Sequence, residues 1–137
     1  MWRSVLSVIA GLVVGIIIIS LIQKLSHWLY PFPAGTDWTN PEAARIAFQK
    51  IPTGSLLMVL FGYISGSFVA GLVTGLIAPQ AATRNAVIAG GILMLAGLVN
   101  LMMLPHPGWF WISMLVYIPF AWLGARSALR MGKRPLM

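Results

Sequence analysis

The chain has 137 residues, and 59% of them are hydrophobic while only 8% are charged. Soluble domains carry about 25% charged residues, so this composition excludes an ordinary water-soluble domain. The absence of cysteine excludes disulfides and thiolate chemistry, and the net charge of +7 comes from Lys and Arg beside apolar segments, where anionic lipid rather than nucleic acid is the expected partner.

The first predicted element is a membrane-spanning helix over residues 4–23. This segment has no charged side chain and about the 20 residues that a helix needs to cross a hydrocarbon core of ~30 Å. Its apolar run is longer than that of a signal peptide, and no Ala-x-Ala-like cleavage site follows it. We therefore expect a retained first helix.

A connection rich in Pro and Gly, YPFPAGTDW, leads from the first span to a short amphipathic helix predicted over residues 41–50. Asn40 is the expected N-cap, Pro41 fits the first helical position, and Glu42 suits the positive end of the helix. The apolar residues expected to lie on the membrane surface are Ala44, Ile46, Ala47, Phe48 and Ile51. We expect this interfacial helix to cover the outer end of the membrane-spanning bundle.

Three further apolar segments predict spans over residues 55–78, 86–104 and 109–125. The whole chain, residues 1–137, is therefore predicted to be a single all-α domain. Its expected fold is an integral membrane bundle of four transmembrane helices, with the short amphipathic helix in the first outer loop.

The distribution of Lys and Arg predicts the orientation of the bundle, because short loops rich in these residues stay in the cytoplasm. With the N-terminus inside, six basic residues lie on the inner side: Arg3, Arg84, Arg126, Arg130, Lys133 and Arg134. Three lie on the outer side: Lys24, Arg45 and Lys50. We therefore expect both termini in the cytoplasm, and we expect the basic tail, Arg126, Arg130, Lys133 and Arg134, to hold anionic lipid headgroups.

Small residues recur at four-residue spacing in three of the predicted spans, which places them on one helical face where two backbones can approach closely. These residues are Ser7, Gly11 and Gly15 in the first span, Gly62, Gly66, Ala70, Ser67, Gly71 and Gly75 in the second, and Ala86 and Gly90 in the third. Because the second span has two adjacent stripes, it is the expected centre of the bundle. The stripes either hold the chain together or join it to another copy, and the first role is the commoner one.

The polar residues predicted inside the spans are Ser20, Ser65, Ser67, Thr74, Asn100, Ser113 and Tyr117. None is ionisable near neutral pH, which disfavours an ion-coupled pump. The amide of Asn100 should form a hydrogen bond to another helix. Pro119 removes the usual donor for the Leu115 carbonyl, so a kink or a bound polar group is expected there, within reach of Ser113 and Tyr117.

Two histidines and two carboxylates lie in the predicted outer loops and form a candidate metal site: His27, His106, Asp37 and Glu42. Such side chains are typical zinc ligands, but these four lack the close spacing of a metal motif. His106 lies between two prolines in LPHPGW, a sequence typical of a tight turn between helices. A turn histidine is therefore the favoured interpretation, and no cofactor is predicted.

LYPFPAGTDWTNPEA, followed at a distance by NLMMLPHPGWFW, resembles an uncharacterised family of small four-helix bacterial inner-membrane proteins. The two stretches cover about a fifth of the chain. The resemblance implies a bacterial inner membrane and transfers no catalytic residues.

Three hypotheses for function follow from the sequence. The favoured one is a non-enzymatic membrane protein that acts through helix packing with itself, with lipid or with a partner subunit. The second is a channel or transporter for an uncharged or apolar solute, lined by Ser65, Ser67, Thr74 and Asn100. The third is a metal-dependent or lipid-modifying enzyme that uses His27, His106, Asp37 and Glu42.

Overall fold

A computed structural model describes residues 2–31, 34–103 and 106–133 of the chain, and within these ranges every regular element is a helix. The α-helices are α1 (Trp2–Leu29), α2 (Pro41–Gln49), α3 (Thr53–Ile77), α4 (Ala82–Met103) and α5 (Tyr117–Lys133). Two 3₁₀ helices precede α4 and α5: η1 (Pro79–Ala81) and η2 (Gly108–Leu115). The predicted all-α fold class is confirmed.

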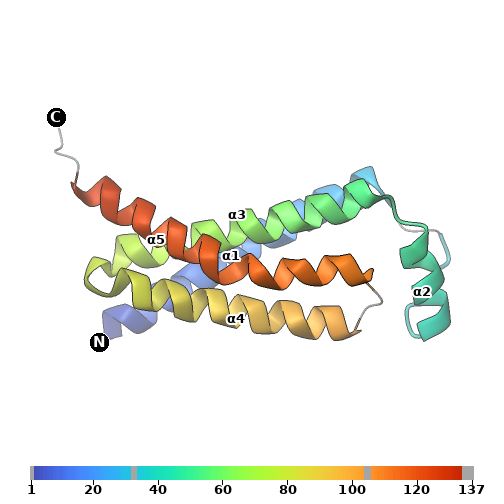
Figure 1. Cartoon of the computed structure of the whole chain (residues 1–137), viewed down its shortest axis with the longest axis horizontal. Helices are drawn as coiled ribbons and strands as arrows, with labels where there is room; N and C mark the ends of the chain where they lie inside the picture. Colours follow the sequence, from blue (N-terminus) through green and yellow to red (C-terminus); the bar gives the residue numbers. More distant parts are fainter. Residues whose placement is uncertain (1, 32–33, 104–105, 134–137) are drawn as a thin grey trace.

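Four helical segments are long and apolar enough to cross a membrane, as expected of a multi-pass membrane protein. They are Trp2–Leu29, Thr53–Ile77, Pro79–Met103 and Gly108–Gly132. Figure 1 shows these segments running lengthwise beside one another, while α2 stands across one end of the bundle. We call this the α2 end; the opposite end, where α1 begins and α5 ends, is the terminal end.

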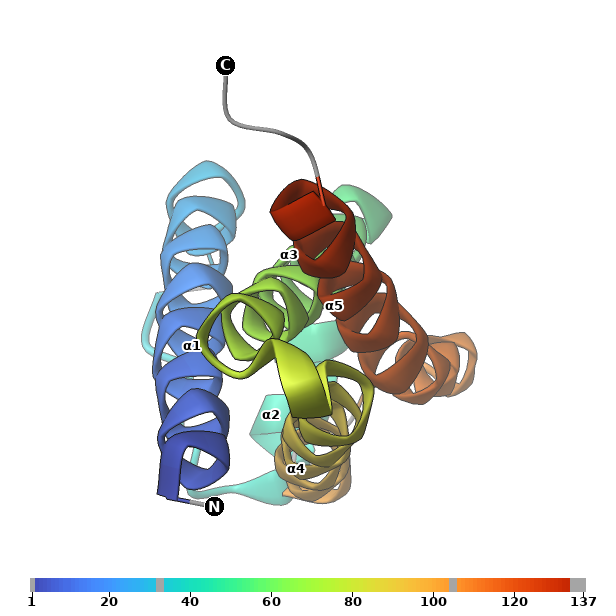
Figure 2. The ribbon, with the colours of Figure 1, turned by 90° about the vertical axis from the view of Figure 1, so that its left-hand side faces the viewer.

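Helix α3 lies at the centre of the bundle and contacts α1, α4 and α5. Viewed along the bundle in Figure 2, α3 lies between α1 and α5. Helices α1 and α4 touch near the terminal end, where the Asn85 amide Nδ2 donates a buried hydrogen bond of 2.9 Å to Ser7 Oγ. From there they diverge toward the α2 end (Figure 2).

The close contact between α1 and α3 depends on glycines, which have no side chain to keep the two backbones apart. A methyl group at Gly11 would lie 2.7 Å from the Ala70 carbonyl oxygen, and one at Gly66 would lie 2.8 Å from the Gly15 carbonyl oxygen. Both distances are too short for a carbon–oxygen contact. The stripe of α3 that contains Gly62, Gly66 and Ala70 is therefore occupied by α1 of the same chain.

The second stripe of α3 faces α5. A methyl group at Gly71 would overlap the Ala121 carbonyl oxygen, and one at Gly75 would lie 2.7 Å from the Ala128 Cβ. On α5 itself, a methyl group at Gly124 would overlap the backbone of α3. The two stripes of α3 thus contact two different neighbours.

Helix α4 also meets α5 through small residues. A methyl group at Gly90 would lie 3.0 Å from the Tyr117 carbonyl oxygen and from the Ala121 Cβ. Ala86 is fully buried in a cluster that includes Ala121 and Ala125. The small residues of all three predicted stripes therefore lie at contacts within one chain.

Helix α1 extends further than the predicted span and ends at Leu29 rather than at residue 23. Pro31 is the first residue after the apolar run that is incompatible with a continuing helix. Polar side chains such as Gln23 and Lys24 do not end a helix, so they remain part of α1.

The fourth span, predicted over residues 109–125 with a kink or a bound polar group at Pro119, is a 3₁₀ helix followed by an α-helix. Pro119 cannot donate to the Leu115 carbonyl, and the chain takes the tighter 3₁₀ geometry before it, with Val116 N–H bonded to the Ser113 carbonyl at 3.3 Å. Pro119 then lies in the first turn of α5, where a missing N–H costs little. Beyond residue 125, α5 continues to Lys133.

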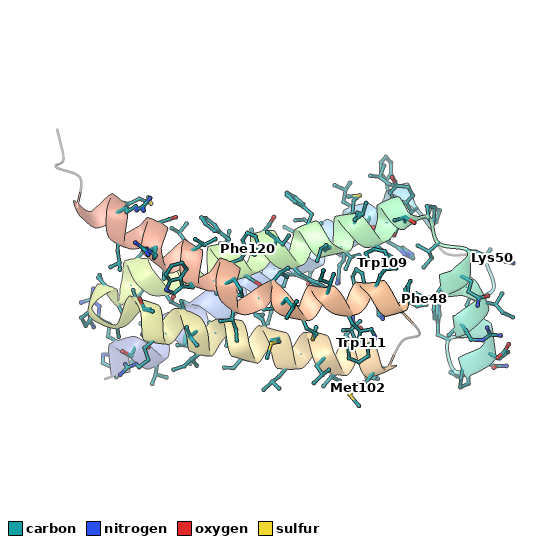
Figure 3. All side chains as sticks on the ribbon, viewed as in Figure 1. Phe48, Lys50, Met102, Trp109, Trp111 and Phe120 are labelled. Atoms are coloured by element: carbon teal, nitrogen blue, oxygen red, sulfur yellow. The ribbon has the colours of Figure 1, made fainter. Side chains whose placement is uncertain are left out.

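Helix α2 begins as predicted: Asn40 Oδ1 accepts hydrogen bonds from the N–H groups of Glu42 (3.0 Å) and Ala43 (3.4 Å). Its apolar face, however, does not lie wholly on the membrane surface. Ala44, Ala47 and Phe48 are buried against the protein, whereas Ile46 is exposed. Figure 3 shows Phe48 on the side of α2 that faces the bundle. Helix α2 therefore covers the end of the bundle.

Candidate ligand pocket

A pocket of about 480 Å³ lies at the α2 end of the bundle. Its wall is formed by the second half of α1 and the first half of α3, with Asn100 of α4, and Phe48 and His106 border it on the α2 side. The pocket lies on the α2 side of the region where α1 and α4 touch through Ser7 and Asn85.

Helix α1 supplies half of the polar side chains that line the pocket. Ser20, Gln23 and His27 are separated by three and four residues, so they lie on one side of the helix, and Lys24 is adjacent to this face. Tyr30, directly after the helix, continues the same lining. The extension of α1 past residue 23 places Lys24 and His27 on the helix beside Ser20 and Gln23 rather than in a loop.

Helix α3 forms another part of the wall, to which α4 adds Asn100. Leu56 and Val59 provide apolar surface, and Tyr63 lies one turn further into the bundle. The Asn100 amide Nδ2 on α4 donates a hydrogen bond of 3.3 Å to the Tyr63 hydroxyl on α3. Asn100 thus has the interhelical partner that the sequence predicted, and the pair borders the pocket.

Two contacts fix α1 to α3 beside the pocket. The buried hydroxyl groups of Ser26 and Ser55 lie 3.1 Å apart, and Ser26 also donates to the Ser55 carbonyl at 3.3 Å. A methyl group at Gly54 would lie 2.9 Å from the Tyr30 hydroxyl, so the Tyr30 side chain, directly after α1, packs against the backbone of α3. These contacts hold the polar face of α1 at a set distance from α3.

His106 belongs to a series of packed rings that joins α2 to the bundle. Its imidazole is nearly parallel to the Phe110 ring, at an interplanar angle of 9° and a centroid distance of 5.1 Å. Phe48 of α2 lies 4.9 Å from His106, and Trp38 contacts Phe48 edge-on at 6.0 Å. Tyr63 continues the series 6.1 Å from Phe110. His106 therefore turns the chain and connects two elements.

The four predicted metal ligands do not gather. Among the described residues no three His, Asp or Glu side chains are placed to share a metal ion. His27 and His106 line the same pocket, but Asp37 and Glu42 do not. Two of the four predicted metal ligands, His27 and His106, therefore lie at the same site.

Both carboxylates outside the pocket have local partners. Asp37 accepts hydrogen bonds from the Thr39 hydroxyl and from its N–H group, and these bonds hold the pKa of Asp37 below its usual value. Glu42 forms an ion pair with Arg45, which lowers the pKa of Glu42. Each carboxylate is therefore stabilised in its charged form within its own loop or helix.

The four residues predicted to line a permeation path are also separated. Asn100 borders the pocket, whereas Ser65, Ser67 and Thr74 do not. Thr74 is fully buried, and its hydroxyl donates to the Gly71 carbonyl of the preceding turn at 2.8 Å. Ser67 and Thr74 thus belong to the packed part of α3, and Ser65 is half-buried outside the pocket.

The two polar residues flanking the 3₁₀ to α junction are buried in the bundle. Ser113 Oγ, like Ser67 Oγ, has no hydrogen-bond partner among the described residues. The Tyr117 ring lies 5.2 Å from Tyr63, and its hydroxyl fills the space left by Gly97. Ser113 and Tyr117 are therefore part of the packed core of the bundle.

Basic residues gather at the terminal end. Arg3 Nε caps the last carbonyl of α3, that of Ile77, at 2.7 Å, and Arg84 bonds Ser4 Oγ at 3.1 Å. Arg126 and Arg130 line a second pocket of about 330 Å³. Arg134 and the side chain of Lys133, both predicted to bind headgroups, lie outside the described residues.

Several residues that line the pocket were not predicted from the sequence as site residues. Gln23, Lys24 and Tyr30 were assigned to the end of a span or to a loop, and Ser26 was not considered. The signal that could have found them is the helical spacing of polar residues from Ser20 onward, which indicates a polar face on a continuing helix.

Comparison of the chain with protein-family models, with curated proteins and with solved structures finds no match.

Proposed function

We propose that this chain is a non-enzymatic membrane protein that binds an amphiphilic molecule, a lipid or a lipid-like compound, in the pocket at the α2 end. The observation that carries the proposal is the pocket itself, which joins a polar face of α1 to an apolar wall on α3. Self-association through the small-residue stripes receives less support, because those stripes contact helices of the same chain.

The size and chemistry of the pocket favour such a ligand. A volume of about 480 Å³ lies within the range of roughly 300 to 1,000 Å³ that is typical of small-molecule sites. Lys24, His27 and His106 line it, and no Asp or Glu does. A headgroup that accepts hydrogen bonds or carries negative charge therefore suits the polar side, while Leu56 and Val59 suit a hydrocarbon tail.

The proposed location is a bacterial inner membrane, with both termini in the cytoplasm. The concentration of Arg3, Arg84, Arg126 and Arg130 at the terminal end supports this orientation, because basic residues favour the cytoplasmic side. The pocket would then open near the outer surface of that membrane.

Native mass spectrometry of the full chain in mild detergent, after incubation with a bacterial lipid extract, tests the proposal. Val59→Trp places a large ring in the pocket, and Leu57→Trp adds the same ring on an exposed position of the same helix as a matched control. We expect the wild type and Leu57→Trp to retain an amphiphile that Val59→Trp loses.

Lys24→Gln provides a second test that does not endanger folding, because the Lys24 side chain is exposed. It should weaken retention of the same amphiphile without removing it. A wild-type chain that retains no amphiphile sensitive to Val59→Trp would contradict the proposed function.

A further inference from the structure

We propose that the second pocket, at the terminal end, binds the phosphate group of an anionic phospholipid. This site lies between the start of α4 and the face of α5 and is separate from the pocket at the α2 end. It is lined by Thr83, Trp122, Arg126, Leu129 and Arg130 and has a volume of about 330 Å³. The inference does not depend on the proposed function.

Two arginines face this pocket from one side of α5. Arg126 and Arg130 are four residues apart, so their side chains emerge on the same helical face, where like charges repel each other. An anion held between them removes that repulsion. Arginine is also suited to phosphate, because its planar guanidinium donates two parallel hydrogen bonds to phosphate oxygens.

The chain supplies no carboxylate side chain to serve as that anion. It has only two acidic residues, Asp37 and Glu42, and both belong to the α2 end. There Glu42 pairs with Arg45, and Asp37 accepts hydrogen bonds from Thr39. An anion bound between the arginines of the second pocket would therefore come from outside the side chains of this protein.

The other two described arginines at the terminal end, Arg3 and Arg84, are engaged with protein atoms. Arg3 donates to the Ile77 carbonyl and Arg84 to Ser4 Oγ. Within the described part of the chain, neither Arg126 nor Arg130 has a hydrogen bond to a protein atom; the Arg126 guanidinium instead lies 4.9 Å above the Trp122 ring. This stacking orders the guanidinium and leaves its N–H donors available at the edge.

The remaining lining residues favour a lipid over a soluble phosphate. Thr83 offers a hydroxyl donor, while Trp122 and Leu129 present apolar surface beside the charged groups. A tryptophan at the end of a membrane-spanning segment is typical of the headgroup level. A phosphodiester with acyl chains attached satisfies both the arginines and this apolar surface.

The test is a titration of the full chain in detergent with phosphatidylglycerol and, separately, with phosphatidylcholine, read by native mass spectrometry. The variant is Arg126→Gln with Arg130→Gln. Its matched control is Arg45→Gln with Lys50→Gln, which removes the same charge from exposed positions at the α2 end. Both positions of the variant are also exposed, so folding should be preserved.

We expect the variant to bind phosphatidylglycerol about 30-fold more weakly, since two lost contacts at an anionic surface correspond to about 2 kcal/mol. The control should change this affinity less than two-fold, and phosphatidylcholine should bind more weakly than phosphatidylglycerol to the wild type. An equal loss of affinity for phosphatidylglycerol in the variant and in the control would overturn the proposal. The net charge of the protein, rather than this pocket, would then explain binding.

A second arm separates the lipid from a soluble phosphate. Glycerol phosphate at millimolar concentration should neither displace phosphatidylglycerol nor raise the thermal stability of the wild-type chain. Stabilisation by glycerol phosphate that disappears in the Arg126→Gln, Arg130→Gln variant, without a preference for phosphatidylglycerol, would overturn the lipid assignment.

Discussion

The imidazole of His106 is stacked on the Phe110 ring at a centroid distance of 5.1 Å, directly where the chain turns from α4 into the fourth span. Phe48 contacts the same imidazole from α2 at 4.9 Å. This pair of ring contacts attaches a nine-residue helix, which is too short to be stable alone, to the membrane-spanning bundle. The attachment also closes one side of the candidate ligand pocket.

Replacing His106 by Ala should detach α2 from the bundle. Each ring contact is worth about 0.5 to 1.5 kcal/mol, so the loss of both should lower the free energy of unfolding by about 1 to 3 kcal/mol and increase amide exchange in α2. Hydrogen exchange in detergent with mass spectrometric readout measures the second effect. His106→Phe should preserve protection, and equal damage by both substitutions would point to a polar role for the imidazole instead.

The contact between α3 and α5 predicts different outcomes for two glycines. A methyl group at Gly71 would overlap the Ala121 carbonyl, so Gly71→Ala should destabilise the chain by about 1 to 3 kcal/mol or prevent folding. Gly91, on α4, has no atom within 4 Å of an added methyl group, so Gly91→Ala should be neutral or stabilising by up to about 1 kcal/mol.

Thermal unfolding in one detergent compares the two glycine variants. Because the glycine stripes contact helices of the same chain, the Gly71→Ala variant should be destabilised even as a monomer at low protein concentration. A defect that appears only through a changed oligomeric state would contradict this assignment of the stripe.

Most of the fold could be predicted from the sequence, because the sequence patterns that indicate each helix are local. Long uncharged segments predicted the four spans, and Asn40 followed by Pro41 predicted the start of α2. The glycine spacing placed α3 at the centre of the bundle, where the structure also has it. Each of these signals depends on residues within one helix or one helical turn.

The pocket was harder to predict from the sequence, because it depends on where α1 ends and on how α1 and α4 diverge. The polar residues after Ser20 were assigned to the end of the span, although nothing before Pro31 stops the helix. Of the two ring neighbours of His106, Phe110 is close in the sequence, but Phe48 comes from α2, far from His106 along the chain. Likewise, the sequence showed that Pro119 removes a hydrogen bond but not that the preceding residues become a 3₁₀ helix.

Asn100 and Tyr63 should be energetically coupled across α4 and α3. Their hydrogen bond is 3.3 Å long, and bonds of this kind inside a membrane contribute about 1 kcal/mol. A double-mutant cycle with Asn100→Leu and Tyr63→Phe, read by thermal or denaturant unfolding, should give a coupling of that size. Strictly additive effects would show that the two side chains act independently.

The pH dependence of α2 should follow Glu42. The Arg45 ion pair lowers the pKa of Glu42, so the support it gives to α2 is complete above the unfolded-state pKa and is lost as the pH falls through the lower, folded-state value. Amide protection in the first turn of α2, taken relative to the intrinsic exchange rate at each pH, should therefore decrease in acid, below the usual Glu pKa. The Glu42→Gln variant should lack this transition; an unchanged transition in that variant would assign it to another group.

The absence of cysteine makes the proposed orientation directly testable. Gln49→Cys lies on the exposed side of α2, and Gly132→Cys lies near the end of α5, where no atom is within 4 Å of an added Cβ. If the α2 end is outside, a membrane-impermeant maleimide should label Gln49→Cys in intact spheroplasts and label Gly132→Cys only after lysis. The reverse pattern would place the termini outside, and the pocket bordered by Lys24 and His106 would then face the cytoplasm.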